Sequence, residues 1–187
     1  MQAQPLYHAS KKVFTLASGE KQLEVNLTWQ GDDMQVVKTY TFYPGKYSID
    51  LKYQITNNTS GAWSGNYYAQ MIRTGSQPKS ASMTRYTYYG AAMSTPDDHF
   101  KKLKPKALLK ANLDQTVQGG WVAMLQHYFV SAIVPNPDQP FHFYSKANTQ
   151  ANLFTVGTLS PTIVVAPGKT AIENMTIYSC PSIAADL

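Results

Sequence analysis

Cysteine and arginine are scarce in this sequence. Cys180 is the only cysteine, so the chain can form neither an intrachain disulfide nor a zinc site built from cysteines. Arg73 and Arg85 stand beside 14 lysines. Because planar recognition of phosphates and bases relies on arginine, the net charge of +5 does not indicate nucleic acid as a partner. No stretch of 18 apolar residues occurs, so we expect no transmembrane segment in this chain.

Motifs for metal binding and nucleophilic catalysis are also missing. The four histidines are His8, His99, His127 and His142. They lack the spacing of a metal site, and no Gly-x-Ser-x-Gly sequence occurs. We therefore predict no catalytic residue, no metal site and no cofactor. His142 alternates with two phenylalanines and is expected to face water, whereas His127 is expected to lie within an apolar strand.

Apolar and polar residues alternate along much of the chain. From Tyr47 to Thr56 every odd position is apolar or aromatic and every even position is polar, which is typical of a strand with one buried face. Further strands are predicted at 23–29, 37–43, 67–73, 85–91, 121–134, 141–145, 153–159, 162–165 and 170–178. With 43% hydrophobic residues and short turns, this pattern predicts a mainly β protein, a β-sandwich forming one domain over residues 1–187.

The region that follows residue 93 predicts the only clear helix start. In Ser94-Thr95-Pro96-Asp97-Asp98, the threonine can cap, proline suits the first helical position, and the acidic residues suit the positive end of the helix dipole. Pro105 limits this helix to about two turns. The stretch 106–113 contains good helix formers, but its state remains open between helix, strand and loop.

A cluster of lysines follows this predicted helix start. The five positive charges are Lys101, Lys102, Lys104, Lys106 and Lys110. A solvated surface is one interpretation. The other is a patch that binds anionic lipid headgroups, because each such charge gains about 1 kcal/mol near an anionic membrane.

Two blocks of the sequence carry a family resemblance. The block 119–135, GGWVAMLQHYFVSAIVP, and the block 90–98, GAAMSTPDD, resemble the large periplasmic domain of the bacterial membrane protein insertase YidC. Weaker likeness extends from Pro5-Leu6-Tyr7 to the last strand. The sequence departs from the family at Cys180-Pro181, where Gly-Pro is common. The family domain also has more sequence before Pro5, which implies absent initial strands and an exposed sheet edge that favours self-association.

The resemblance implies a supersandwich similar to galactose mutarotases, with one or two short helical turns. It implies a periplasmic location, tethered to the inner membrane by helices outside this chain, and partners among Sec translocon components and inserting membrane proteins. The expected partner surface comprises Gly90, Ser94, Thr95, Pro96, Asp97, Asp98, Gln126 and Tyr128. The function implied by this resemblance is a non-catalytic one, in which the domain offers an interaction surface to these partners. One alternative is a sandwich that binds a carbohydrate or peptide in a groove lined by some of its 13 tyrosines. The other is a mutarotase-like enzyme, which needs a histidine and a carboxylate converging in a pocket.

Overall fold

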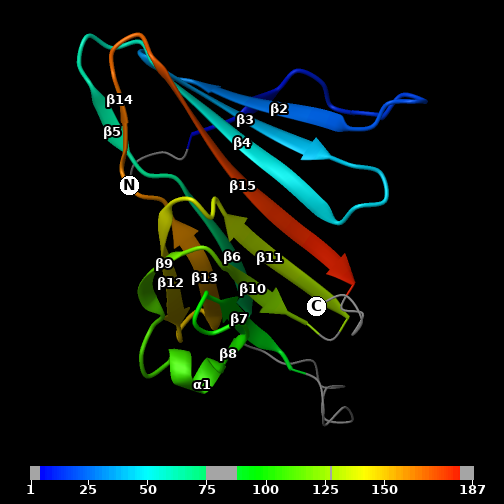
Figure 1. Ribbon diagram of the computed structural model, residues 1–187, viewed down its shortest axis with the longest axis vertical. Helices are drawn as coiled ribbons and strands as arrows, with labels where there is room; N and C mark the ends of the chain where they lie inside the picture. Colours follow the sequence, from blue (N-terminus) through cyan, green and yellow to red (C-terminus); the bar gives the residue numbers. More distant parts are fainter. Residues whose placement is uncertain (1–4, 75–87, 127, 182–187) are drawn as a thin grey trace. The chain divides into compact units, whose positions relative to one another are not determined.

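The computed structural model describes residues 5–74, 88–126 and 128–181, and these residues form antiparallel β-structure (Figure 1). The chain divides into two compact units. The first unit comprises Met1–Asn66 and Thr162–Ile177, and the second comprises Tyr67–Pro161 and Tyr178–Leu187. That residues 1–187 act as one domain stays a prediction.

The first unit contains a sheet in the order β1-β2-β3-β4-β15 and a separate pair of short strands, β5 and β14. Its strands are β1 (His8–Ala9), β2 (Leu23–Gln30), β3 (Met34–Phe42), β4 (Ser48–Asn57), β5 (Trp63–Gly65), β14 (Ile163–Val165) and β15 (Thr170–Pro181). The last four residues of β15 belong to the second unit. The alternation in β4 confirms its strand prediction, because Leu51, Tyr53 and Ile55 are buried while the residues between them are partly exposed. The short β1 pairs with only two residues of β2, Leu27 and Thr28.

Asn57 closes the end of β4 with a buried hydrogen-bond network. Its side-chain amide donates to the carbonyl oxygens of Gly61 and Val165, at 2.8 Å each, and its Oδ1 accepts the backbone N–H of Thr59 at 2.9 Å. The side chain is fully buried, so each polar atom needs such a partner. The network fixes the turn after β4 and joins it to β14.

The second unit is a sandwich of two sheets. One sheet has the order β11-β10-β7-β8 and the other the order β6-β13-β12-β9. The elements are β6 (Tyr68–Thr74), β7 (Gly90–Ser94), β8 (Lys101–Leu103), α1 (Pro105–Leu108), β9 (Asp114–Gln118), β10 (Trp121–Leu125), β11 (Phe129–Pro135), β12 (Pro140–Asn148) and β13 (Leu153–Leu159). Strand β13 packs across the interior on β10 and β11, and Phe141, Phe143 and Val156 are completely buried. The two sheets thus hide their facing apolar sides from water.

The prediction of one strand over 121–134 was wrong, because this segment is a hairpin. Val122 pairs with Ile133 and Leu125 with Val130, and the N–H of Gln126 donates to the carbonyl of Phe129 at 2.8 Å. A continuous apolar run does not reveal such a turn, because both arms of the hairpin are apolar. His127, expected within this strand, lies outside the described residues, as do residues 85–87 of the strand predicted over 85–91.

The helix predicted from Ser94 to Pro105 was also wrong. Thr95 does act as a cap, because its hydroxyl accepts the N–H of Asp98 at 3.0 Å, but its own N–H donates to the carbonyl of Asp98 and closes a turn. Residues that a second helical turn would use form β8 and pair with β7. The helix α1 begins instead at Pro105, where the fixed φ of proline suits a first helical position. In the part of the chain that the structure describes, no helix is long and apolar enough to cross a membrane.

Gly120 allows the turn before β10 to pass close to β7. Its φ is +100°, and a Cβ at this position would collide with the carbonyl oxygen of Ser94. Gly119 has a similar φ of +77°, but a Cβ there would make only an ordinary contact with Pro96 at 3.8 Å. A side chain at Gly119 would therefore introduce backbone strain alone, whereas a side chain at Gly120 would add a steric clash.

We predict that Gly120→Ala lowers the free energy of unfolding by at least about 3 kcal/mol, the sum of left-handed strain and overpacking. Gly119→Ala is the matched control and should cost only about 1 kcal/mol, because it introduces the strain alone. Urea denaturation followed by circular dichroism measures both values. Equal losses for the two variants would contradict the close approach of Gly120 to Ser94.

Candidate functional site

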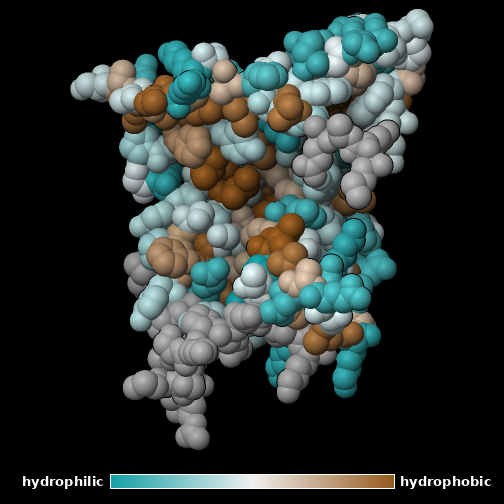
Figure 2. Space-filling view, turned by 180° about the vertical axis from the view of Figure 1, so that it is seen from behind, coloured by the Kyte–Doolittle hydropathy of each residue, from teal (hydrophilic) through white to brown (hydrophobic). Residues whose placement is uncertain are grey.

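An open hollow of about 650 Å³ lies on the second unit, and we call it the apolar groove. Its lining is almost entirely apolar and comprises His99, Phe100, Trp121, Ala123, Leu125, Val130, Ala132, Val134, Tyr178 and Cys180. The space-filling view shows hydrophobic residues exposed among hydrophilic ones on the face that it presents (Figure 2). The floor residues Ala123, Leu125, Val130 and Ala132 are themselves buried, whereas Phe100 and Tyr178 are exposed. Exposed apolar side chains that gather around a hollow are typical of an interaction site.

The apolar groove arises from the alternation of side chains in β10 and β11. Val122 and its partner Ile133 point to the side opposite that of their neighbours, and both are buried. On the groove side, Ala92, Ala123 and Ala132 stand in register across β7, β10 and β11. Because methyl groups fill so little space, this row of alanines leaves a hollow where larger residues would form a flat surface.

Aromatic side chains border the apolar groove. The rings of Phe100 and Trp121 lie 6.0 Å apart, and 46% of Phe100 is exposed. Tyr88 packs against the row of alanines, and its hydroxyl donates to the carbonyl of Ala91 at 2.8 Å. Burial raises the pKa of Tyr88, which keeps this hydroxyl protonated and able to donate. Tyr178 is also partly exposed at the border.

The predicted partner surface does not form a single patch. Ser94 pairs with Trp121 and Gly90 pairs with Leu125, so the two predicted groups lie at opposite ends of the β7–β10 ladder. Pro96, Asp97, Asp98, Gln126 and Tyr128 are exposed, and Ser94 and Thr95 are partly buried. Gly90 is buried, and the role of these residues as a partner surface stays a prediction. Between the two ends, Ala123 lines the apolar groove, and Ala92 belongs to the same buried cluster.

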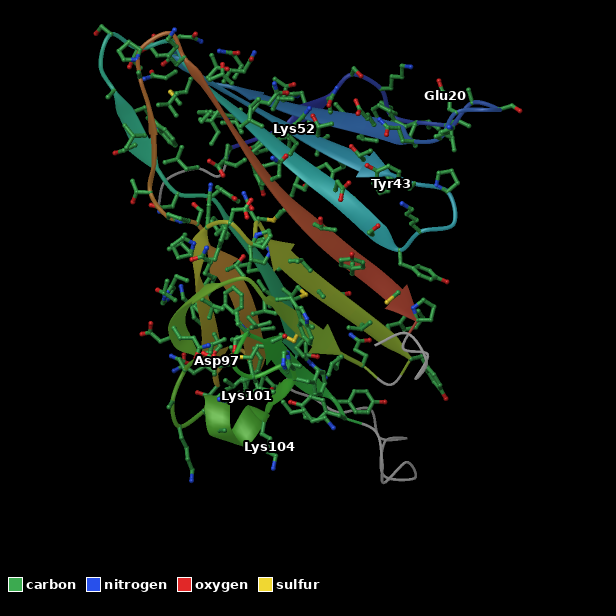
Figure 3. The ribbon with its side chains drawn as sticks, in the orientation of Figure 1. Glu20, Tyr43, Lys52, Asp97, Lys101 and Lys104 are labelled. Carbon is green, nitrogen blue, oxygen red and sulfur yellow. The ribbon has the colours of Figure 1, made fainter. Side chains whose placement is uncertain are left out.

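The predicted lysine cluster spans β8, α1 and the residues after it. Lys101 forms an ion pair with Asp98 at 3.4 Å, and Lys102 lies over the ring of Tyr88 at 5.2 Å from its centroid. Lys104 and Lys110 are exposed, and the side chain of Lys106 lies outside the described part. Figure 3 shows Asp97, Lys101 and Lys104 at the same end of the second unit, near α1. The carboxylate of Asp98 thus offsets the positive charge of Lys101.

A second hollow, of about 510 Å³, lies on the outer side of the β6-β13-β12-β9 sheet, and we call it the tyrosine groove. Its lining is mixed and comprises Tyr68, Gln70, His142, Tyr144, Lys146 and Leu159. His142 is partly exposed, as predicted, and its Nε2 lies 3.4 Å from Oδ1 of Asp114, whose side chain is 81% exposed. No group of three His, Cys, Asp or Glu residues suited to a metal ion occurs among the described residues.

Comparison with known families identifies the whole chain. The family described as the YidC periplasmic domain matches residues 1–187. The membrane protein insertase YidC of Coxiella burnetii (strain Dugway 5J108-111) is 42% identical over 97% of this chain. The protein of the same name from Pseudomonas fluorescens (strain SBW25) is 38% identical over 98% of it. The chain spans about a third of the length of these relatives, 33% in both cases.

Solved structures of low sequence identity share the fold. A galactose mutarotase related enzyme from Lactobacillus acidophilus matches with a TM-score of 0.60 at 8% identity, over 92% of this chain and 70% of that chain. A galactose mutarotase-like protein from Lactobacillus casei matches with a TM-score of 0.56 at 9% identity, over 94% and 72%. These likenesses confirm the predicted mainly β, mutarotase-like sandwich, and at such identities they concern the fold alone.

Proposed function

This chain belongs to the family of YidC periplasmic domains, and we propose that it is a non-catalytic docking domain of a membrane protein insertase. In this role it offers a binding surface in the periplasm to Sec translocon components or to chains that are being inserted. The apolar groove carries the proposal, because its lining is almost entirely apolar and aromatic residues border it. Removing such a surface from water stabilises a complex by roughly 25 cal/mol per Å² of apolar area.

The chemistry of the apolar groove suits an apolar segment of a partner. Aromatic residues such as Trp and Tyr often dominate the binding energy of an interface, and Trp121, Phe100 and Tyr178 all line the groove. The exposed residues at the two ends, Asp97 and Tyr128 among them, supply a polar rim. A partner segment along the β7–β10 ladder would therefore contact both predicted groups of residues at once.

We predict that photo-crosslinkers at Thr95, Asp97 and Tyr128, and at Phe100 and Tyr178 in the groove, capture a Sec translocon component or a stalled inserting chain. The experiment uses the full-length insertase in membranes and identifies the captured protein by antibody. A crosslinker at Tyr47, equally exposed but in the first unit, is the control and should capture neither. Capture from Tyr47 alone, or from no position, would refute the assignment of this surface.

The lysine cluster supports a second contact, with anionic lipid headgroups. Lys102, Lys104 and Lys110 are exposed at one end of the second unit. Long-range attraction to an anionic membrane acts on such charges over about 8 Å at physiological salt. This contact would hold the domain near the membrane surface, where inserting chains pass.

Replacing Lys102, Lys104 and Lys110 by Glu should weaken binding to phosphatidylglycerol vesicles by about a hundredfold, because each lysine contributes about 1 kcal/mol. The matched control replaces Lys21, Lys46 and Lys169, which are exposed in the first unit, and should bind more strongly than the cluster variant. Co-sedimentation with vesicles at low salt measures both. Unchanged binding of the cluster variant would remove the lipid contact from the proposal.

A mutarotase-like reaction is the alternative that the second hollow raises. His142 and Asp114 do meet at its side, but their contact joins the imidazole to the acid, and both groups are open to water. Ring opening of an aldose needs an acid and a base on separate atoms of the sugar, in a site that excludes water. We predict that the purified chain leaves the rate of glucose mutarotation, followed by polarimetry, at the rate in buffer. Acceleration that is lost in His142→Gln would establish an enzyme and overturn the non-catalytic role.

A further inference from the structure

We propose that the tyrosine groove binds an uncharged saccharide chain. The groove lies on a face of the second unit that the docking proposal does not use. Its floor is formed by two rows of residues in register across β6, β13 and β12. The first row is Gln70, Gly157 and Tyr144, and the second is Tyr68, Leu159 and His142.

Gly157 gives the tyrosine groove its aromatic floor. A Cβ at Gly157 would lie only 2.9 Å from Cζ of Tyr144, so the ring can cross β13 only because this residue lacks a side chain. The Tyr144 hydroxyl then reaches β6 and donates to Oε1 of Gln70 at 2.9 Å. Burial, and to a lesser extent the neighbouring Tyr68, raise the pKa of Tyr144, which keeps this hydroxyl protonated. The ring is therefore held in place before any ligand binds.

A second ring extends this floor along β12. The rings of His142 and Tyr144 lie nearly parallel, with an interplanar angle of 11° and centroids 6.4 Å apart. The residues that alternate with them, Phe141 and Phe143, are completely buried in the core, which fixes the strand beneath. Parallel aromatic rings on a rigid strand offer flat surfaces to the apolar C–H faces of sugar rings.

Hydrogen-bonding groups surround the aromatic floor. Because Oε1 of Gln70 accepts the Tyr144 hydroxyl, the NH₂ group of Gln70 remains as a donor for a ligand. The hydroxyl of Tyr68, whose residue is 55% exposed, can both donate and accept, and Lys146 adds an ammonium group 5.5 Å from the Tyr144 centroid. Sugar hydroxyls both donate and accept, so they match this mixed set.

Charge and topology favour a saccharide over other ligands. Lys146 is the one lysine of the lining, and the carboxylate of Asp114 lies beside His142 at the side of the groove, so no cluster of positive charges selects an anion such as a phosphate. Strands β12 and β13 are paired on both sides within their sheet. They therefore offer no free edge, and a peptide could add as a further strand only beside β6 or β9 at the ends of the sheet, not over Gly157 and the Tyr144 ring. An uncharged sugar chain needs neither a net charge nor a strand edge.

The test titrates this chain, labelled with ¹⁵N, with tetra-N-acetylchitotetraose and, in parallel, with maltotetraose. At least one sugar should cause saturable shifts of the backbone amides of Gln70, Tyr144 and Gly157. Gln70→Ala and Tyr144→Ala should weaken that binding by about tenfold or more, because each removes a group of the floor or its border. Tyr47→Ala, at an exposed tyrosine of the first unit, should leave the binding unchanged.

Gln70→Ala keeps the test valid if Tyr144→Ala fails to fold, because Gln70 is exposed and contributes nothing to the buried core. The absence of saturable shifts with both sugars would overturn the proposal. Shifts with an extended apolar peptide, but not with either sugar, would likewise replace it by a peptide site. The crosslinking results for the apolar groove are independent of all these outcomes, because they concern different residues.

Discussion

The β11-β10-β7-β8 sheet of the second unit has two apolar faces, and both the core of this unit and the apolar groove depend on that constraint. One face, with Val122 and Ile133, packs against the sheet that contains Phe141, Phe143 and Val156. On the opposite face, Ala92, Ala123 and Ala132 are buried beneath side chains such as Tyr88 and Trp121, and the apolar groove opens beside them with Phe100 and Tyr178 exposed at its border. Apolar surface left in water favours association. The same strand alternation that builds the core thus produces the apolar groove.

The two hollows of the second unit arise from small residues in contrasting ways. In the apolar groove, the row Ala92, Ala123 and Ala132 leaves space above a sheet, and the resulting surface is almost entirely apolar. In the tyrosine groove, Gly157 lets a large ring lie across the sheet, and polar groups surround that ring. The first surface suits an apolar protein segment, and the second suits a ligand with hydroxyl groups. Both lie on strands with buried neighbours, which hold their geometry.

Much of the fold could be predicted from period-two alternation, because burial of one face fixes the identity of every second residue. Strand β13 has the predicted bounds 153–159, and the predicted β4 differs from the observed one by a single residue at each end. The errors concern segments where that signal is weak. Both arms of the β10–β11 hairpin are apolar, so the run 121–134 does not show its turn. The short β8, rich in lysine, lies at a sheet edge and has no alternation to read.

The sites could be predicted only in part. The family resemblance indicated the ends of the apolar groove, but its lining of alanine, valine and leucine residues cannot be distinguished from core in the sequence. The signal that could have located it is the apolar run at both odd and even positions of 121–134, which implies two buried or binding faces. The tyrosine groove depends on pairs such as Gln70 and Tyr144, which are 74 residues apart in the chain. Strand pairing over such distances is set by the tertiary fold and not by local pattern.

The central claim is that the apolar groove is covered when the insertase engages a partner. Hydrogen–deuterium exchange of the full-length insertase, with and without a stalled inserting chain and the translocon, measures it most directly. We expect slower exchange in Trp121–Leu125 and Phe129–Pro135 on engagement, with Leu23–Gln30 of the first unit unchanged. Identical exchange of the two groove strands in both states would contradict the account.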